Sequence, residues 1–420
     1  MVYSNRYDNI SDLLRRLPGV HRRWYSAVRL NTMPGDIRMN PHQTRALEIL
    51  ESLGNRPAAP FHEGGPASYL IEQATVLGVD VRVDEFGNVI AHYEGGDLGT
   101  ERVDPPIAYV AHMDHPGYEI VEVGERGTIA RALGGVPVVS MKQSVAVLAL
   151  LSDGSRVRAK LIPPGGPLSD DPDDRLVLVE FEVDVEFAPP VPLVFDLVNF
   201  TLDGDLIRMR AADDLAGCAS GLAALERIVA DEVNVDFYAV WTRAEEGGLW
   251  GARLMAEAGT LPKDTLVVSI ESSPVIPGVA QGEGPVIRTG DRMFTFDADA
   301  EQIFIVAQDA IQSRNPNFKV QRQLMSGGSC EATAFAVFGY KATGIAFPLG
   351  NWHNATTFIG DPQGGIGPEY IHVDDFLGGV ELLTEAAKSV GKRNDSPTRA
   401  RVRQIPADIR ARMASSGQWV

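Results

Sequence analysis

From Ala212 onwards, segments with the apolar spacing of helices alternate with segments typical of strands. The helical segments include LAGCASGLAALERIVAD, GLWGARLMAEAG, IFIVAQDAIQSR and VDDFLGGVELLTEAAKSV, and the strand segments are DFYAVWTRAEE, TLVVSIESS and TGIAFPL. Strands that alternate with helices form a mainly parallel sheet with helices on both faces. We therefore predict an α/β fold, a three-layer α/β/α domain around a mainly parallel mixed sheet.

The amino-terminal part supplies further elements of the same domain. A helical pattern begins at Pro41 and ends at Gly54, which we interpret as a C-cap. A second helical segment, ASYLIEQATVLG, precedes the alternating segment VDVRVDEFGNVIAHYEG, which is typical of a hairpin. The apolar run Ile107 to Ala111 then predicts a buried strand that delivers polar residues at its carboxyl end, where ligands gather in open α/β sheets.

A region of different character interrupts this pattern. Residues 118–205 contain short β-rich runs separated by Pro and Gly clusters and show no long helical period. That pattern is typical of a small β domain inserted into another fold. We predict a catalytic domain over 41–117 and 206–391 with the β domain between its two parts. Residues 1–40 form an amino-terminal extension, and the Arg-rich residues 392–420 form a tail.

Composition excludes several classes of protein. The net charge is −18, whereas nucleic-acid binding and docking on anionic membranes both need a concentrated basic face. The longest apolar run, from Val145 to Leu151, is far shorter than a membrane span, and the first thirty residues lack a signal-peptide pattern. Two cysteines cannot form a disulfide framework. We expect a cytoplasmic enzyme with no nucleic-acid or membrane partner.

Five short segments place histidine or carboxylate residues at the end of an apolar run or at the start of a helix. Each has an ordinary structural explanation, such as helix capping for an Asp or a solvated turn for paired Glu residues. Jointly they form a mixed N/O ligand set suited to zinc, cobalt or manganese. The segments are AHMD (His112, Asp114), ADDLAG (Asp213, Asp214), AEEGG (Glu245, Glu246), SIESS (Glu271) and GNWHN (His353).

This set predicts a site for two divalent metal ions. A dinuclear site needs one bridging carboxylate, with one histidine and one further carboxylate on each metal. The five-residue set supplies those ligands and leaves Glu245 free to take a proton from water.

The order HMD, DD-x-x-G, EE-G-x-x-G, E and H resembles the co-catalytic zinc aminopeptidase clan. It is most similar to the tetrahedral, glutamyl and deblocking aminopeptidase family, over about residues 41–390. The resemblance implies a peptide substrate, and a PDZ-like β domain at 118–205 that carries a homo-oligomer interface. It also implies roles for the residues at the matching motifs: His112, Asp213 and Glu271 on one metal, Asp213, Glu246 and His353 on the other, Asp114 orienting His112, and Glu245 as general base.

Two assignments have competitors within the chain. His372, in PEYIH, also resembles the family's last histidine motif, and we prefer His353 because it closely follows the strand TGIAFPL. We expect His372 to pack locally, before a helix capped by Asp374 or Asp375. The segment MSGGSCEATAF resembles a glycine-rich part of the family's substrate cleft, where Ser329 or Glu331 would meet substrate. The competing interpretation is a glycine loop that opens a helix, with Glu331 in its first turn.

Other functions share part of this evidence. A two-metal amidohydrolase, deacylase or carboxypeptidase on the same scaffold would use the same ligands. Such deacylases usually place their extra domain after the Glu-Glu motif, whereas here it precedes the Asp-Asp motif. A metal-free binding protein with the same fold would be expected to have lost ligands. Serine-hydrolase and nucleotide-binding functions lack their motifs in this sequence.

Overall fold

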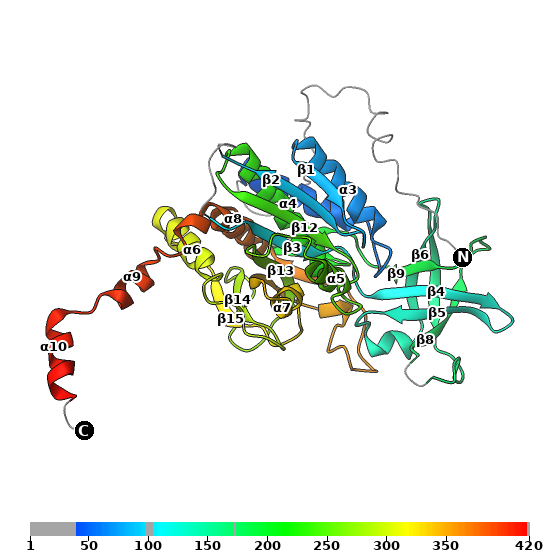
Figure 1. Ribbon diagram of the computed structural model, residues 1–420. Helices are drawn as coiled ribbons and strands as arrows, with labels where there is room; N and C mark the ends of the chain where they lie inside the picture. The colour runs from blue at the N-terminus through cyan, green and yellow to red at the C-terminus, as the bar shows by residue number, and fades with distance from the viewer. Residues whose placement is uncertain (1–38, 97–103, 172–173, 418–420) are drawn as a thin grey trace. The chain divides into compact units, whose positions relative to one another are not determined.

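The computed structural model describes residues 39–96, 104–171 and 174–417, so the predicted extension over 1–40 lies almost entirely outside it. Its largest element is a mixed eight-stranded sheet (Figure 1). Four of the seven strand pairs are parallel, including the three that join the central strands β12, β3, β13 and β16. The order is β1 (Asp80–Val83), β2 (Val89–Glu94), β12 (Asp236–Thr242), β3 (Ile107–His112), β13 (Leu266–Pro274), β16 (Lys341–Leu349), β14 (Val286–Gly290) and β15 (Gln321–Leu324).

Helices cover both faces of this sheet, and the alternation of side chains along β3 shows why. Ile107, Tyr109 and Ala111 belong to a buried cluster that also contains residues of one helical layer. Ala108 and Val110 belong to a second cluster, on the other face. The first layer contains α2 (Pro41–Gly54), α3 (Gly64–Val76), α4 (Ala212–Ala230), α6 (Gln302–Arg314) and α8 (Val373–Lys388), and the second contains α5 (Trp250–Ala258) and α7 (Glu331–Val337). The predicted α/β fold is confirmed.

The inserted β region forms a closed six-stranded antiparallel barrel with its own apolar core. Its strands are β4 (Gly117–Gly124), β5 (Gly127–Leu133), β8 (Leu176–Phe181), β7 (Arg156–Ile162), β6 (Val145–Leu150) and β9 (Val191–Phe195), with η1 (Val138–Met141) between β5 and β6. The strands β10 (Thr201–Asp203) and β11 (Leu206–Met209) do not belong to the barrel. They form a separate three-stranded sheet with β17 (Glu369–His372).

One expectation about a helix end differs from the structure. Gly54 is the last residue of α2, and the C-cap is Asn55. Gly54 is needed for space, because a Cβ there would lie 2.5 Å from the carbonyl oxygen of Asn199. The predicted tail contains two helices in its described part, α9 (Pro397–Arg403) and α10 (Ala407–Ser416), which follow η3 (Val390–Lys392). None of the helices in the described ranges has the length and hydrophobicity of a membrane span.

Candidate active site

Four of the five predicted metal-binding residues lie at or near the carboxyl ends of the central parallel strands. His112 is the last residue of β3, Glu246 follows β12, Glu271 lies in the second half of β13, and His353 lies in η2 (Trp352–Asn354) after β16. Asp213, the fifth, lies in the first turn of α4. Because parallel strands end at the same edge of a sheet, residues far apart in sequence meet here.

The ligand atoms of these residues form overlapping groups. One group contains His112, Asp213 and Glu271, and another contains Asp213, Glu246 and His353, with the potential ligand atoms of each group within 4.8 Å of one another. Asp213 belongs to both groups, which is the position that a bridging carboxylate needs.

His112 presents one ring nitrogen to this cluster. Its Nδ1 donates to the carbonyl oxygen of Asp114 at 3.0 Å, which assigns the Nδ1 hydrogen. Its Nε2 lies 3.3 Å from Oδ1 of Asp213. In the neutral ring, Nε2 therefore carries a lone pair, which faces a carboxylate oxygen. A proton or a metal ion between the two atoms would make this contact favourable.

His353 has the same arrangement on the other side of Asp213. Its Nδ1 donates to the carbonyl oxygen of Gly135 at 2.8 Å, and its Nε2 lies 3.2 Å from Oε1 of Glu246. A backbone carbonyl that fixes the ring of a metal-binding histidine is a common feature of metal sites. Gly135 leaves room for the ring, since a Cβ there would lie 2.6 Å from Nδ1.

Several buried oxygens in the cluster have no hydrogen-bond partner among the described residues: Oδ1 of Asp213, Oε1 of Glu271 and Oδ2 of Asp214. A buried carboxylate oxygen without a partner is costly, so such atoms point to an additional ligand. Nitrogen and carboxylate donors in this number suit zinc and similar divalent ions. The donor set therefore fits a metal centre.

The electrostatics of the cluster agree with this interpretation. Burial and the nearby carboxylate of Glu271 raise the pKa of Glu245 well above its usual range, and burial and Asp213 do the same for the pKa of Glu271. Burial lowers the pKa of His112, but the carboxylates of Glu245, Asp114 and Asp213 outweigh it and raise that pKa well above its usual range. The cluster thus holds more negative charge than the protein neutralises, which favours the binding of cations.

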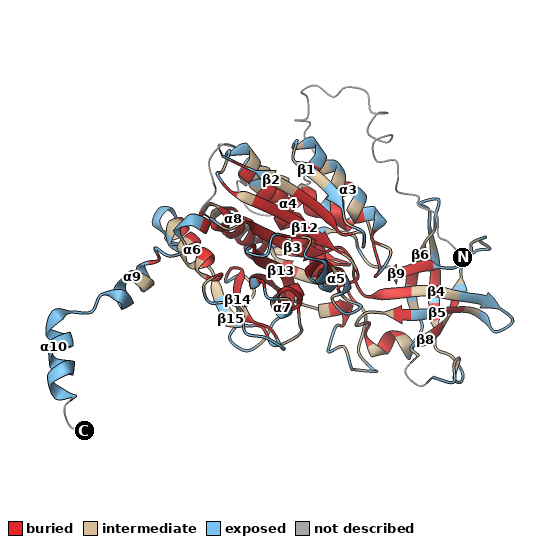
Figure 2. Cartoon of the chain, viewed as in Figure 1, coloured by how far each residue is buried: buried red, intermediate tan, exposed pale blue. Residues whose placement is uncertain are grey.

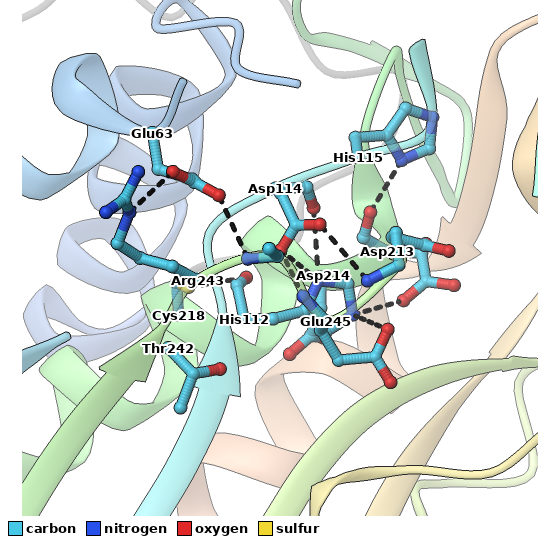
Figure 3. A network of polar contacts seen from close by, with 12 residues as sticks. Glu63, His112, Asp114, His115, Asp213, Asp214, Cys218, Thr242, Arg243 and Glu245 are labelled. Carbon is cyan, nitrogen blue, oxygen red and sulfur yellow. Dashed lines mark hydrogen bonds and ion pairs between the residues drawn. The ribbon is translucent and has the colours of Figure 1, made fainter. Parts of the chain in front are cut away.

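Two buried carboxylates hold the backbone that carries the Glu pair (Figure 3). Asp114 accepts from the backbone N–H of Glu245 at 3.0 Å and of Glu246 at 3.1 Å. Glu63 accepts from the backbone N–H of Ala244 at 2.9 Å and from Nε of Arg243 at 2.7 Å. Asp114 also contacts the ring of His112, with its carbonyl oxygen 3.0 Å and its Oδ1 3.7 Å from Nδ1, so the same residue lies against the histidine and positions the turn.

Sequence reasoning missed Glu369, a fully buried residue that opens β17. Its Oε2 accepts from the backbone N–H of Asp213 at 2.9 Å, and its Oε1 accepts from that of His353 at 2.8 Å. His115 was also missed, and it donates from Nδ1 to the carbonyl oxygen of Asp213 at 2.7 Å. Both residues fix the backbone of predicted ligands. The sequence signal was the acid in PEYIH and the second histidine of AHMDH.

The cluster lies at the base of a cavity of about 230 Å³. Ser329 lines this cavity, as do Leu249, Trp352 and the buried Arg288. Glu331 does not line it. It is fully buried and accepts from Oγ1 of Thr242 at 2.6 Å and from Oγ of Ser269 at 3.2 Å, as the first residue of α7. The interpretation of Glu331 as part of a helix start therefore fits the structure better than substrate contact.

His372 belongs to none of the potential metal-binding groups in the described part of the chain. It is itself the N-cap of α8, with Nδ1 accepting from the backbone N–H of Asp374 at 3.1 Å. The expectation that Asp374 or Asp375 caps this helix is wrong. Asp375 instead accepts from the backbone N–H groups of Gly282 and Gly284.

Comparison with known proteins gives a family match and a shared fold. A model of the M42 glutamyl aminopeptidase family matches residues 189–360. The TET1 peptidase of Pyrococcus horikoshii has a similar structure, with a TM-score of 0.66 and 22% identity over 81% of this chain and 99% of that one. An aminopeptidase of the archaeon Desulfurococcus kamchatkensis gives a TM-score of 0.65 and 22% identity, over 84% of this chain and 98% of that one. The resemblance predicted from the sequence is confirmed: this chain is similar to the M42 glutamyl aminopeptidases over residues 189–360 and shares the fold of the TET peptidases.

Proposed function

We propose that this protein is an aminopeptidase that uses two divalent metal ions to hydrolyse the N-terminal residue from peptides. In this proposal His112, Asp213 and Glu271 hold one ion, and Asp213, Glu246 and His353 hold the other. The observation that carries it is the shared position of Asp213 between two histidines whose Nε2 atoms both face carboxylate oxygens.

Glu245 is the proposed general base. It lies in the cavity wall with Oε2 3.8 Å from Nε2 of His112. It forms a third potential metal-binding group with His112 and Glu246 but belongs to neither of the two groups that share Asp213, and we therefore assign it the role of base. Asp114 fixes its backbone, so the carboxylate stays beside the metal-binding residues. When bound, the ions polarise the substrate carbonyl and lower the pKa of water. Glu245 takes the proton from the attacking water and returns it to the leaving amine.

The metal and the domain division are part of the same proposal. The ligand set suits zinc, with cobalt or manganese as alternatives. We assign residues 41–117 and 206–391 to the catalytic domain, 118–205 to a PDZ-like inserted domain, and 392–420 to a tail. Known structures with this fold include a dodecamer of TET1, and the P. horikoshii TET1 peptidase can assemble into a tetrahedron or an octahedral shell. We propose a homo-oligomer whose subunits contact one another through the inserted barrel.

Arg288 suggests which N-terminal residue the enzyme prefers. Its side chain is 1% exposed and lines the cavity, and its Nε and Nη1 have no hydrogen-bond partner among the described residues. A buried guanidinium with free donors is well suited to bind a carboxylate in a bidentate manner. We propose that substrates with an acidic N-terminal residue place that side chain on Arg288, in agreement with the glutamyl aminopeptidase description of the matched family.

The competing function is a two-metal deacylase or carboxypeptidase with the same ligands. The position of the barrel, before Asp213 in the chain, supports the aminopeptidase. A screen of the metal-loaded protein against aminoacyl amides, their N-acetyl derivatives and C-terminally free dipeptides tests the proposal. Turnover of the free-amine substrates that is lost with chelator supports it. Turnover restricted to N-acyl substrates contradicts it and favours the deacylase.

A further inference from the structure

The carboxyl-terminal helices α9 and α10 contain no buried residues (Figure 2). The first residues of this tail make hydrogen bonds to the catalytic domain. Ser396 is fully buried beside Gln302, and Arg399 donates to Oδ1 of Asp299 at 2.9 Å. Asp299 also accepts from Lys341, the first residue of β16, so the tail leaves from the amino-terminal edge of the main sheet.

The tail presents an apolar stripe to solvent. Val402 is 72% exposed, Ile405 55%, Ile409 44% and Met413 67%. The spacing of four places Ile409 and Met413 on one side of α10, and Ile405 lies in the non-helical segment just before it. A helix of this length is marginal by itself, and most helices in proteins are stabilised by packing of an apolar face. The stripe is therefore suited to a partner surface.

The positive charge of the tail indicates what kind of partner surface it would bind. Residues 392–420 contain seven Lys or Arg and two Asp, whereas the rest of the chain contains 31 Lys or Arg and 54 Asp or Glu. A basic segment with apolar side chains is complementary to an acidic surface that also exposes apolar side chains.

The end of the barrel that carries the β4–β5 turn exposes both acidic and apolar side chains. Val123, near the end of β4, is exposed, and so is Val183 in the segment after β8. The register pairs Val123 with Thr128 and Thr128 with Val179, so the turn and the end of β8 lie at the same end of the barrel. These two segments expose five acids and one base. The acids are Glu122, Glu125, Glu182, Asp184 and Glu186, and the base is Arg126, which pairs with Glu122 at 2.8 Å.

We propose that α10 of one copy docks on this acidic end of the barrel of a second copy. A contact within one chain is not available, because the barrel follows β3 at the carboxyl edge of the main sheet, and the tail starts at the opposite edge. Reaching the acidic end of the barrel from there would take about 55 Å, the combined length of the nine-residue β16 and the eight-residue β4. The helices α9 and α10 and the three residues between them extend to only about 35 Å. The inference extends the proposed assembly through the barrel and names the segment that binds there.

Cross-linking between differently tagged, co-produced full-length chains tests this contact. Both native cysteines are buried, so Met413→Cys in one chain and Val183→Cys in the other introduce accessible thiols. Mild oxidation should give a disulfide-linked pair that carries both tags. Val76→Cys, 79% exposed on α3, replaces Val183→Cys as the matched control and should give little product.

Charge reversal supplies the second arm of the test. Adding Arg410→Glu and Arg412→Glu to the tail should lower the cross-linked fraction at least about tenfold, and Glu182→Arg with Glu186→Arg in the partner should restore it. The proposal is overturned if Met413→Cys cross-links equally well to Val183→Cys and to the Val76→Cys control. It is also overturned if charge reversal leaves the cross-linked fraction unchanged. Tail-dependent binding to anionic vesicles without cross-linking overturns it as well. Peptidase activity is measured on the same samples, and its absence beside intact cross-linking counts against the proposed function alone.

Discussion

Nε2 of His353 lies 3.2 Å from Oε1 of Glu246, while the other ring nitrogen of His353 donates to the carbonyl of Gly135. The two residues come from loops after different strands, β16 and β12. His353 has a φ of 55°, in the left-handed region, and Glu369 accepts its backbone N–H. Non-glycine residues in this conformation cluster at functional sites, which supports the proposed role of His353 as a metal ligand.

Replacing each of the two competing histidines separates their roles. His353→Ala should remove about one metal ion per chain and abolish peptidase activity, because it removes a ligand. His372→Ala should leave metal content and activity nearly unchanged and cost about 0.5–2 kcal/mol in unfolding free energy, because His372 caps α8. Metal analysis, activity and thermal unfolding of both variants check this. Loss of metal from His372→Ala with full occupancy in His353→Ala would reverse the assignment.

The adjacent acids Glu245 and Glu246 should also behave differently. Glu245→Gln should lower kcat by about 10²- to 10⁴-fold and keep the metal content, because a general base is lost but no ligand. Glu246→Gln should instead weaken metal binding, since Glu246 groups with Asp213 and His353. The amide keeps the shape of each side chain, so each variant is the control for the other. Metal loss in Glu245→Gln alone would exchange the two roles.

Much of the fold was predictable because its signals are local. The alternation of helix and strand patterns after Ala212 predicts the sheet, and the run from Ile107 to Ala111 predicts β3. Features that depend on tertiary contacts were not predictable in this way. Gly54 looks like a helix cap but is required by the backbone of Asn199, and strands β10 and β11 pair with the distant β17 rather than with the barrel.

In the candidate site, too, local sequence patterns predicted some residues, while others depend on tertiary contacts. The five predicted ligands follow apolar runs or, for Asp213, open a helix, which makes them recognisable, and the structure brings them together. Glu369 and Glu63 act through backbone N–H groups of residues far away in sequence, and no motif records such bonds. Arg288 resembles any arginine in a strand until its burial and its free donors are known.

Chelator-treated protein should lose stability as pH rises. The folded-state pKa values of Glu245 and Glu271 lie well above 4.5, so the folded metal-free protein binds more protons than the unfolded chain. Their contribution to unfolding free energy is thus fully present below about pH 4.5 and is lost as pH rises through the raised values. Bound metal ions replace those protons.

Urea unfolding of chelator-treated and metal-loaded protein across about pH 5 to 8 measures this effect. The metal-free form should show the steeper loss of unfolding free energy, and Glu271→Gln should reduce that slope. Parallel pH profiles of the two forms would show that these carboxylates do not carry the excess charge that we assign to them.

Arg288 should control the preference for acidic substrates. Arg288→Gln should lower kcat/KM for glutamyl substrates by about 10- to 100-fold relative to alanyl substrates, because a charge-assisted pair is lost. Arg288→Lys keeps the charge without the bidentate geometry and should lie between the two. Paired kcat/KM values for glutamyl and alanyl amides check this. An equal loss on both substrates would indicate a structural role for Arg288.

The central claim is that His112, Asp213, Glu246, Glu271 and His353 form one centre for two metal ions. Metal content per chain, measured by mass spectrometry after reconstitution with zinc, cobalt or manganese and removal of free ions, tests it most directly. The account predicts about two ions per chain in the wild type, and about one or fewer after Asp213→Asn, because Asp213 belongs to both groups. Fewer than about one ion per wild-type chain with every metal would contradict it.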